Sequence, residues 1–185
     1  MSLLNTKKLT ARSFLHLQDP PDARLELVNG EIAVSPSPTL EHSFIDRMLT
    51  TILNTHILQH HLGRLYGDID TLFDEFNVRR PDLLFIRTER LALLMNATVC
   101  AIPPDLCIEI LSPSSSTMDQ VEKFELYQKH GVPHYWLVDP KAQSIDAYTL
   151  TNGTYQLAAT AKGSAIAHLP PFPELAINLG DLWPT

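Results

Sequence analysis

Two carboxylates stand inside apolar segments of this chain, where an unpaired charge is costly. Glu109 lies in the middle of LCIEIL at residues 106–111, and Asp82 follows a proline at the start of PDLLFI. Burying a lone carboxylate costs several kcal/mol, so each one either faces water or has a cationic partner. Carboxylate oxygens suit Mg²⁺ or Mn²⁺, with water and substrate oxygens completing the shell. If the two segments are neighbouring strands, this pair predicts a site for one such ion.

Lys123 adds a positive charge fourteen residues after Glu109. It lies in a segment that predicts a helix over about residues 118–130. A lysine beside a metal-bound water can orient that water and stabilise the charge that develops on a phosphate. We therefore expect Asp82 and Glu109 to hold the ion, with the backbone carbonyl of Ile110 as a further ligand. Lys123 would then reach back over this strand.

The hydrophobic pattern predicts the strands that must position these groups. One strand is predicted in RRPDLLFI, residues 79–86, which is entered through Pro81, and another at residues 106–111. The spacing of 27 positions from Asp82 to Glu109 leaves room for a connection and a return to a neighbouring strand. Alternating apolar residues on both sides of Asn29-Gly30 predict a β-hairpin, because both residues tolerate the positive φ of a type I′ turn.

A long amphipathic helix is predicted by TLEHSFIDRMLTTILNTHILQH at residues 39–60. Two apolar runs recur in it at helical spacing: Phe44, Met48 and Ile52, and Ile45, Leu49 and Leu53. We expect the stripe that begins at Phe44 to lie in the core. A strand HYWLVD, a hairpin around Asn152-Gly153 and a Pro-rich tail follow. The order of these elements predicts a mixed α/β (α+β) fold with helices around one sheet.

Length and composition indicate one globular domain over residues 1–185, of which 44% are hydrophobic and 19% charged. No apolar run approaches the roughly 18 residues that span a bilayer, and we expect no signal peptide at the start. The two cysteines, Cys100 and Cys107, fit no metal-binding spacing, and a reducing cytoplasm is expected. The net charge of −7 argues against tight non-specific DNA binding but leaves room for a local basic groove.

Each candidate residue also has a simpler structural interpretation. Asp82 can pair with Arg79 or Arg80, which directly precede it. Glu109 can face outward or form a structural ion pair, and Lys123 can be one of the solvent-facing lysines that helices commonly carry. A carboxylate pair with a lysine occurs often by chance, so the residues alone leave a metal site and ordinary ion pairs both open.

Four segments together resemble one family. LELVNGEIAVSPSPTLEHS, RRPDLLFI, DLCIEILSPSS and KFELYQKHGVPHYWLVDP are similar to the Uma-type family of restriction-endonuclease-like bacterial proteins, over about residues 9–182. A Pro-Asp pair that opens one strand, a Glu within the next and a nearby Lys also resemble the PD-(D/E)XK nuclease superfamily. The resemblance implies the restriction-endonuclease-like fold: a mixed central β-sheet flanked by helices, with an N-terminal β-hairpin.

The same resemblance assigns roles to residues. Asp82 matches the Asp of the PD element, and Glu109 matches the acidic residue of the (D/E)XK element. The lysine of that element would fall two residues after Glu109, where this chain has Leu111. Lys123, on the following helix, is therefore the expected replacement.

Two further polar residues match recurrent positions of the family: His42, at the start of the long helix, and Glu31, in the hairpin. The resemblance implies a Mg²⁺- or Mn²⁺-dependent endonuclease that hydrolyses DNA phosphodiester bonds in the bacterial cytoplasm. It also implies a homodimer, and exposed aromatic residues of the tail, Phe172 and Trp183, are expected to contribute to its interface.

Two other functions remain open. The acidic net charge and the displaced lysine favour a catalytically inactive binding module on the same fold. A carboxylate pocket also fits a metal-dependent hydrolase whose substrate is not DNA. The positions of the cations distinguish these functions: a basic rim of Arg79, Arg80 and Lys123 around the carboxylates supports a nuclease, whereas a uniformly acidic cleft supports one of the alternatives.

Overall fold

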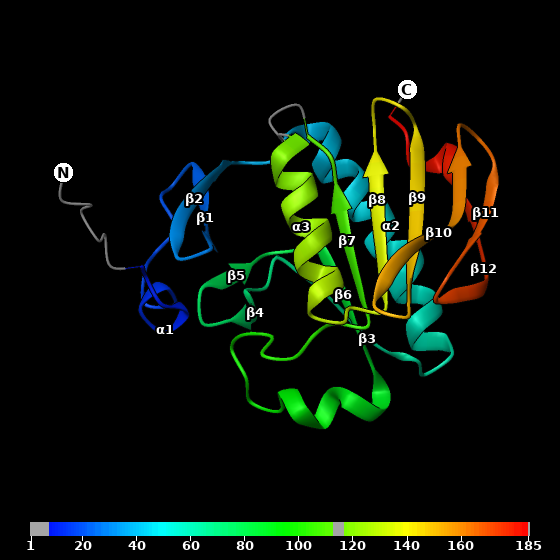
Figure 1. Cartoon of the computed structure of the whole chain (residues 1–185). Coiled ribbons are helices and arrows are strands. Elements are labelled where there is room, and N and C mark those ends of the chain that lie inside the picture. Colours follow the sequence, from blue (N-terminus) through cyan, green and yellow to red (C-terminus); the bar gives the residue numbers. More distant parts are fainter. Residues whose placement is uncertain (1–7, 113–116, 185) are drawn as a thin grey trace.

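The computed structural model of the protein describes residues 8–112 and 117–184 (Figure 1). The helices and strands are, in chain order, α1 (Ala11–Phe14), β1 (Ala23–Val28), β2 (Glu31–Pro36), α2 (Leu40–Gln59), β3 (Gly63–Gly67), β4 (Thr71–Asp74), β5 (Asn77–Arg79), β6 (Leu83–Arg87), the 3₁₀ helix η1 (Thr88–Leu94), β7 (Leu106–Ile110), α3 (Thr117–Lys129), β8 (His134–Asp139), β9 (Ser144–Thr151), β10 (Thr154–Lys162), β11 (Ile166–Leu169), β12 (Phe172–Asn178) and the 3₁₀ helix η2 (Leu179–Asp181). Among these described residues, no helix has both the length and the apolar character of a membrane span.

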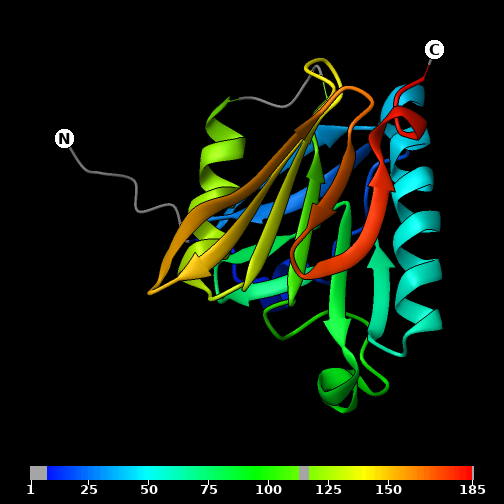
Figure 2. The same cartoon turned by 90° about the vertical axis from the view of Figure 1, so that its right-hand side faces the viewer.

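The largest sheet has six strands in the order β10-β9-β8-β7-β6-β3. Strands β7 and β8 run parallel and are joined through α3, while the other neighbours in this sheet are antiparallel. Helices α2 and α3 lie on opposite faces of it (Figure 2). The predicted mixed sheet flanked by helices is therefore confirmed.

The expectation of one sheet was too simple, because the strands of the described residues form three. The hairpin β1–β2 joins β5 and β4 in a sheet of order β2-β1-β5-β4, and β11–β12 form a third sheet of two strands. Strand β1 meets β5 through the pair Leu27↔Val78. This pairing joins segments far apart in the chain, so the local alternation of residues does not reveal it.

Residue preferences within a few positions explain the turn between β1 and β2 and the start of α2. Asn29 and Gly30 have φ of 51° and 84°, as the predicted type I′ hairpin turn requires. Helix α2 begins after Thr39, whose side chain accepts a hydrogen bond from the backbone N–H of His42 at 3.2 Å. This N-cap satisfies one of the free N–H groups of the first turn and places His42 at the start of the helix.

The core lies on both faces of the six-stranded sheet, and α2 meets it through a stripe one residue away from the predicted one. The buried side chains of α2 are Ile45, Leu49, Leu53 and Ile57. The prediction was wrong for Phe44, which is 42% exposed, whereas Met48 and Ile52 are partly buried at the margin of the core. Both stripes have helical spacing, so only the direction in which the helix faces the sheet distinguishes them.

The aromatic residues of the tail are also placed differently from the prediction. Phe172 and Trp183 are 3% and 8% exposed and belong to the same core cluster as Trp136. The indole N–H of Trp183 donates to the carbonyl of Gly163 at 2.7 Å. Because the β11–β12 sheet packs onto the core, these aromatic side chains face inward and are not available to form an interface.

Candidate active site

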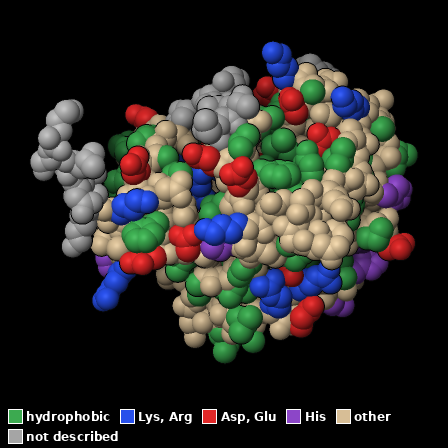
Figure 3. Space-filling model, viewed as in Figure 1, with side chains coloured by type: hydrophobic (Ala, Val, Ile, Leu, Met, Phe, Trp, Pro, Cys, Tyr) green, Lys and Arg blue, Asp and Glu red, His purple; other side chains and the backbone are tan. Residues whose placement is uncertain are grey.

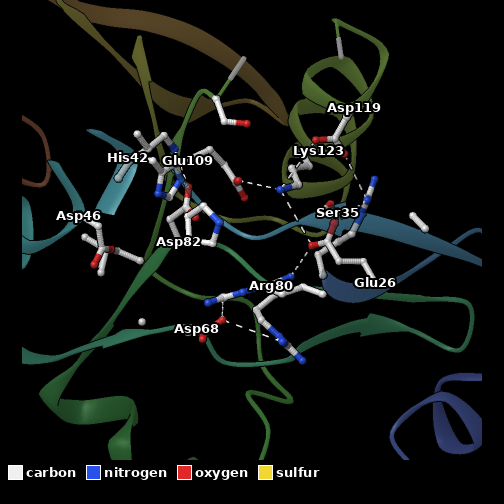
Figure 4. Close-up of a pocket in the computed structure, with 18 of the residues that line it drawn as sticks. Glu26, Ser35, His42, Asp46, Asp68, Arg80, Asp82, Glu109, Asp119 and Lys123 are labelled. Atoms are coloured by element: carbon white, nitrogen blue, oxygen red, sulfur yellow. Dashed lines mark hydrogen bonds and ion pairs between the residues drawn. The ribbon is translucent and has the colours of Figure 1, made fainter. Parts of the chain in front are cut away.

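The five side chains predicted to form a site all line one cleft of about 980 Å³. They come from different elements: Glu31 from β2, His42 from α2, Asp82 from the residue before β6, Glu109 from β7 and Lys123 from α3. Ile110 lines the cleft as well. Figure 4 shows His42, Asp82, Glu109 and Lys123 pointing into the same space. The fold thus brings together residues that are spread over about half of the sequence.

The two carboxylates meet because their strands are neighbours. Strands β6 and β7 pair antiparallel in the register Leu83↔Ile108. Asp82 directly precedes Leu83 and Glu109 directly follows Ile108, so both lie at the same end of the ladder. The backbone N–H of Ile110 donates to Oδ2 of Asp82 at 2.7 Å and fixes this carboxylate beside β7. The condition for the predicted site, that these two strands are neighbours, is therefore met.

Glu109 faces inward and has two partners. Its Oε2 accepts a hydrogen bond from Nζ of Lys123 at 2.7 Å, and its Oε1 accepts one from the hydroxyl of Tyr127 at 2.6 Å. Its side chain is 8% exposed, which excludes the outward-facing alternative. Burial raises the pKa of Glu109 to about 7, against the opposing effect of Lys123 and with help from the negative charge of Asp82.

Lys123 is held by its neighbours and does not face solvent. Its side chain is 12% exposed, and its ammonium also lies 4.0 Å from carboxylate oxygens of Glu26 and Asp119. Burial by itself lowers the pKa of Lys123, but the surrounding carboxylates, chiefly Glu109, outweigh it and raise the pKa above its ordinary value. The ammonium is therefore a fixed positive charge in the cleft at neutral pH.

His42 contacts the other carboxylate. Its Nε2 lies 3.2 Å from Oδ2 of Asp82, and its Nδ1 is buried without a hydrogen-bond partner in the described part of the chain. Burial lowers the pKa of His42, whereas the hydrogen bond and negative charge of Asp82 raise it by more, so the net shift is upward. His42 and Asp82 thus form a pair in which the imidazole holds positive charge to higher pH than usual.

Five of the eight acidic residues of the cleft were missed in the sequence, and two of them lie close to the predicted site residues. Glu26 on β1 is 6% exposed, although it stands in LELV between two leucines, and this is the same signal that identified Glu109. Asp46 lies one turn after His42 on α2, and burial together with repulsion from Asp82 raises its pKa. The helical spacing of four from His42 was the signal for Asp46. Glu31 lines the cleft from the exposed end of the hairpin, and its role stays a prediction.

The arginines of the cleft are bound to acids other than Asp82. Arg79 is buried and contacts Glu26 at 3.2 Å, with longer contacts of 3.4 Å to two carboxylates of α3. Arg80 contacts Asp19 at 2.6 Å and Asp70 at 2.8 Å. The alternative in which Asp82 is paired with Arg79 or Arg80 is therefore wrong.

The cleft has neither a free basic rim nor a uniformly acidic wall. Eight carboxylate side chains and six cationic ones line it. On the face of the molecule that carries α3 and the β1–β2 hairpin, acidic and basic side chains are interspersed (Figure 3). This balance suits binding of a divalent cation better than attraction of a polyanion by charge alone.

The donor set of the carboxylate pair fits a hard divalent cation. Among residues 8–112 and 117–184, no three or more His, Cys, Asp and Glu side chains gather as a ready-made metal cluster. Mg²⁺, however, usually keeps several waters and binds through one or two carboxylates plus phosphate oxygens of the substrate. Asp82 and Glu109 supply two carboxylates at one end of a strand pair, which matches that requirement.

Stability is expected to depend on pH through Glu109. Its folded pKa of about 7 lies above the ordinary 4.5, so its protonated form stabilises the fold below pH 4.5, and this contribution is lost as pH rises through 7. Urea unfolding between pH 5 and 8 should therefore show the wild type losing about 1–3 kcal/mol relative to Glu109→Gln, which does not titrate. If the unfolding free energies of the two proteins change in the same way with pH over this range, the raised pKa of Glu109 is contradicted.

Comparison with known proteins identifies close likenesses along nearly the whole chain. The model of a family named Uma2, described as "Putative restriction endonuclease", matches residues 11–180. "Uncharacterized protein sll1609" of Synechocystis sp. is 24% identical over 150 residues, which cover 80% of this chain and 84% of that protein. The crystal structure of "a putative nuclease belonging to DUF820" from Anabaena variabilis superimposes with a TM-score of 0.80 at 26% identity, over 95% of this chain and 97% of that one.

Proposed function

The chain belongs to the Uma2 family, and from this premise we propose that it is an endonuclease that hydrolyses DNA phosphodiester bonds with Mg²⁺ as cofactor. The observation that supports this most is the convergence of Asp82, Glu109 and Lys123 in one cleft. Two carboxylates at one strand end with an ammonium 2.7 Å from one of them are the groups that metal-assisted phosphoryl transfer requires.

Each residue has a separate task in this proposal. Asp82 and Glu109 would hold Mg²⁺ or Mn²⁺, with the carbonyl of Ile110 as a further ligand, and the ion would supply an acidified water and neutralise charge on the scissile phosphate. Lys123 places a permanent positive charge beside the reacting phosphate. His42, through its contact with Asp82, holds that carboxylate in place and offers a proton to a phosphate oxygen.

The displaced lysine is compatible with this chemistry. Leu111 stands where the superfamily motif has lysine, two residues after Glu109. The ammonium of Lys123 nevertheless contacts Glu109 at 2.7 Å, because α3 lies against β7 and its Lys123 side chain lines the cleft (Figure 4). A lysine supplied by the next helix can therefore take the task of the motif lysine in this proposal.

We further propose that the protein acts as a homodimer in the bacterial cytoplasm. Two copies related by a two-fold axis present two identical clefts, which suits cleavage of the two antiparallel strands of a DNA duplex. The dimer interface must lie elsewhere than at Phe172 and Trp183, which are buried. Light scattering over a range of concentrations tests this: a constant monomer mass would contradict it.

The first test of the function is calorimetric titration of Mn²⁺ into the wild-type protein, followed by incubation with supercoiled plasmid DNA. We expect one bound ion per chain and conversion of the plasmid to nicked and linear forms, both abolished by a chelator. Metal binding is measured first because absence of cleavage alone can reflect a missing recognition sequence in the plasmid. A protein that binds no Mn²⁺ with or without DNA would overturn the proposal.

The acidic excess in the cleft favours a second candidate function. Five of the cations that line the cleft are engaged by carboxylates: Arg24, Arg47, Arg79, Arg80 and Lys123. The cleft therefore attracts a polyanion only weakly. A catalytically inactive binding module, or a metal-dependent hydrolase acting on a substrate other than DNA, fits this charge balance. Absence of Mn²⁺ binding supports the binding module, whereas Mn²⁺ binding together with hydrolysis of a substrate other than DNA supports the metal-dependent hydrolase.

A further inference from the structure

The ammonium of Lys123 lies among three carboxylates from three elements. It contacts Oε2 of Glu109 on β7 at 2.7 Å and lies 4.0 Å from Oε1 of Glu26 on β1. Asp119, one turn earlier on α3, is also 4.0 Å away. Figure 4 shows Lys123 pointing between Glu109 and Glu26. These two acids belong to different sheets.

Engagement of Glu109 by a metal ion would disturb this arrangement. Both oxygens of Glu109 are occupied, Oε1 by the hydroxyl of Tyr127 and Oε2 by Lys123. A divalent cation on Glu109 competes for these oxygens and repels the ammonium, since like charges a few ångströms apart destabilise each other strongly away from water. The Lys123 side chain is 12% exposed, so its charge then needs another acid inside the cleft.

The carboxylate of Glu26 is placed to pair with the Lys123 ammonium in that case. Its Oε1 accepts the backbone N–H of Arg80 at 2.7 Å, and its Oε2 accepts from Nη1 of Arg79 at 3.2 Å. These contacts fix the carboxylate while leaving Oε1 directed toward Lys123. Asp119 is less suited, because its side chain is 36% exposed. The flexible stem of a lysine allows the ammonium to close the remaining gap to Glu26 without movement of α3.

We propose that Glu26 is a positioning residue of the site, which holds the Lys123 ammonium in the cleft when Glu109 binds the metal ion. This inference rests on the proposed function. Glu26 acts through Lys123 and is not itself a ligand. It therefore keeps the positive charge beside the reacting phosphate while Glu109 changes partner.

A double-mutant cycle with Mn²⁺ as the probe tests this directly. Wild type, Glu26→Gln, Lys123→Met and the double variant are titrated calorimetrically, and circular dichroism with urea unfolding verifies the fold of each. In the wild-type background Glu26→Gln should weaken Mn²⁺ binding at least about fivefold, because only the more exposed Asp119 then remains to pair with the ammonium when the ion binds. In the Lys123→Met background Glu26→Gln should leave the Mn²⁺ affinity unchanged, because no ammonium remains to pair with Glu26.

The matched control is Glu122→Gln, which removes another carboxylate that contacts Arg79, at 3.4 Å, and should leave Mn²⁺ affinity unchanged. If Lys123→Met does not fold, Lys123→Gln takes its place as the neutral partner. Equal losses for Glu26→Gln in both backgrounds would overturn the inference, as would no loss in either, while the metal-dependent function stands. A wild type that binds no Mn²⁺ would overturn both, so the two failures are distinguishable.

Discussion

Replacing Asp82 with asparagine is expected to lower the rate of plasmid cleavage by about 10²–10³-fold and to weaken Mn²⁺ binding at least about tenfold. The substitution removes the negative charge that a metal ligand requires, and metal-based stabilisation of the transition state is worth several kcal/mol. Initial rates of plasmid nicking at saturating Mg²⁺, with calorimetric titration of Mn²⁺, measure both effects.

Asparagine is chosen because it separates chemistry from folding. Its side-chain oxygen can still accept the N–H of Ile110, which donates to Asp82 at 2.7 Å, so the unfolding free energy should change by less than about 1 kcal/mol. Asp181→Asn is the matched control, since Asp181 is exposed and does not line the cleft. Cleavage by Asp82→Asn at the rate of this control would show that Asp82 is not a ligand.

Replacing Arg79 with methionine is expected to lower the free energy of unfolding by about 3–5 kcal/mol, or the melting temperature by roughly 6–20 °C. Arg79 is 1% exposed and contacts Glu26 at 3.2 Å, so its loss leaves a buried carboxylate without its cation. Arg79 also connects the four-stranded sheet β2-β1-β5-β4 to α3, through ion pairs with Asp119 and Glu122. Urea unfolding at pH 7 measures the loss.

Two variants show whether the buried charge causes this loss. Adding Glu26→Gln to Arg79→Met should recover part of the stability, because glutamine keeps an acceptor for the N–H of Arg80 and carries no charge. Arg47→Met is the control: Arg47 is 79% exposed and lies 3.9 Å from Asp46, so its loss should cost less than about 0.5 kcal/mol. A loss in Arg79→Met no larger than in this control would show that Arg79 does not support the fold.

Short-range patterns in the sequence predicted most of the helices and strands and some of the residues that line the cleft. The Asn29-Gly30 turn, the start of α2 and the two strands around Asp82 and Glu109 follow from residue preferences within a few positions. Glu109 was identified because a carboxylate in an apolar strand needs a partner, and the structure supplies Lys123 and Tyr127. The pairing of the two carboxylate strands was also predictable, since they are successive strands of similar length.

Other features depended on contacts that no local pattern contains. Glu26 and Arg79 are 53 positions apart and meet only because β1 pairs with β5. The family resemblance pointed to Glu31 at the hairpin, whereas Glu26 on the preceding strand is the acid of β1 that lies 4.0 Å from the Lys123 ammonium. Likewise Phe44 and Ile45 have equivalent spacing in α2, and only the packing of the helix against the sheet decided that Ile45 is buried.

The sequence by itself therefore determined the elements, the family resemblance and the chemical types of the site, because periodicity, turn preference and the cost of a buried charge are local properties. Only the tertiary structure decided which acid faces which cation. Ion pairs inside the cleft depend on distances of a few ångströms between chain segments remote in sequence, and strand pairing and helix orientation set those distances. The placement of Glu26, Asp46 and Arg79 in the cleft follows from that geometry alone.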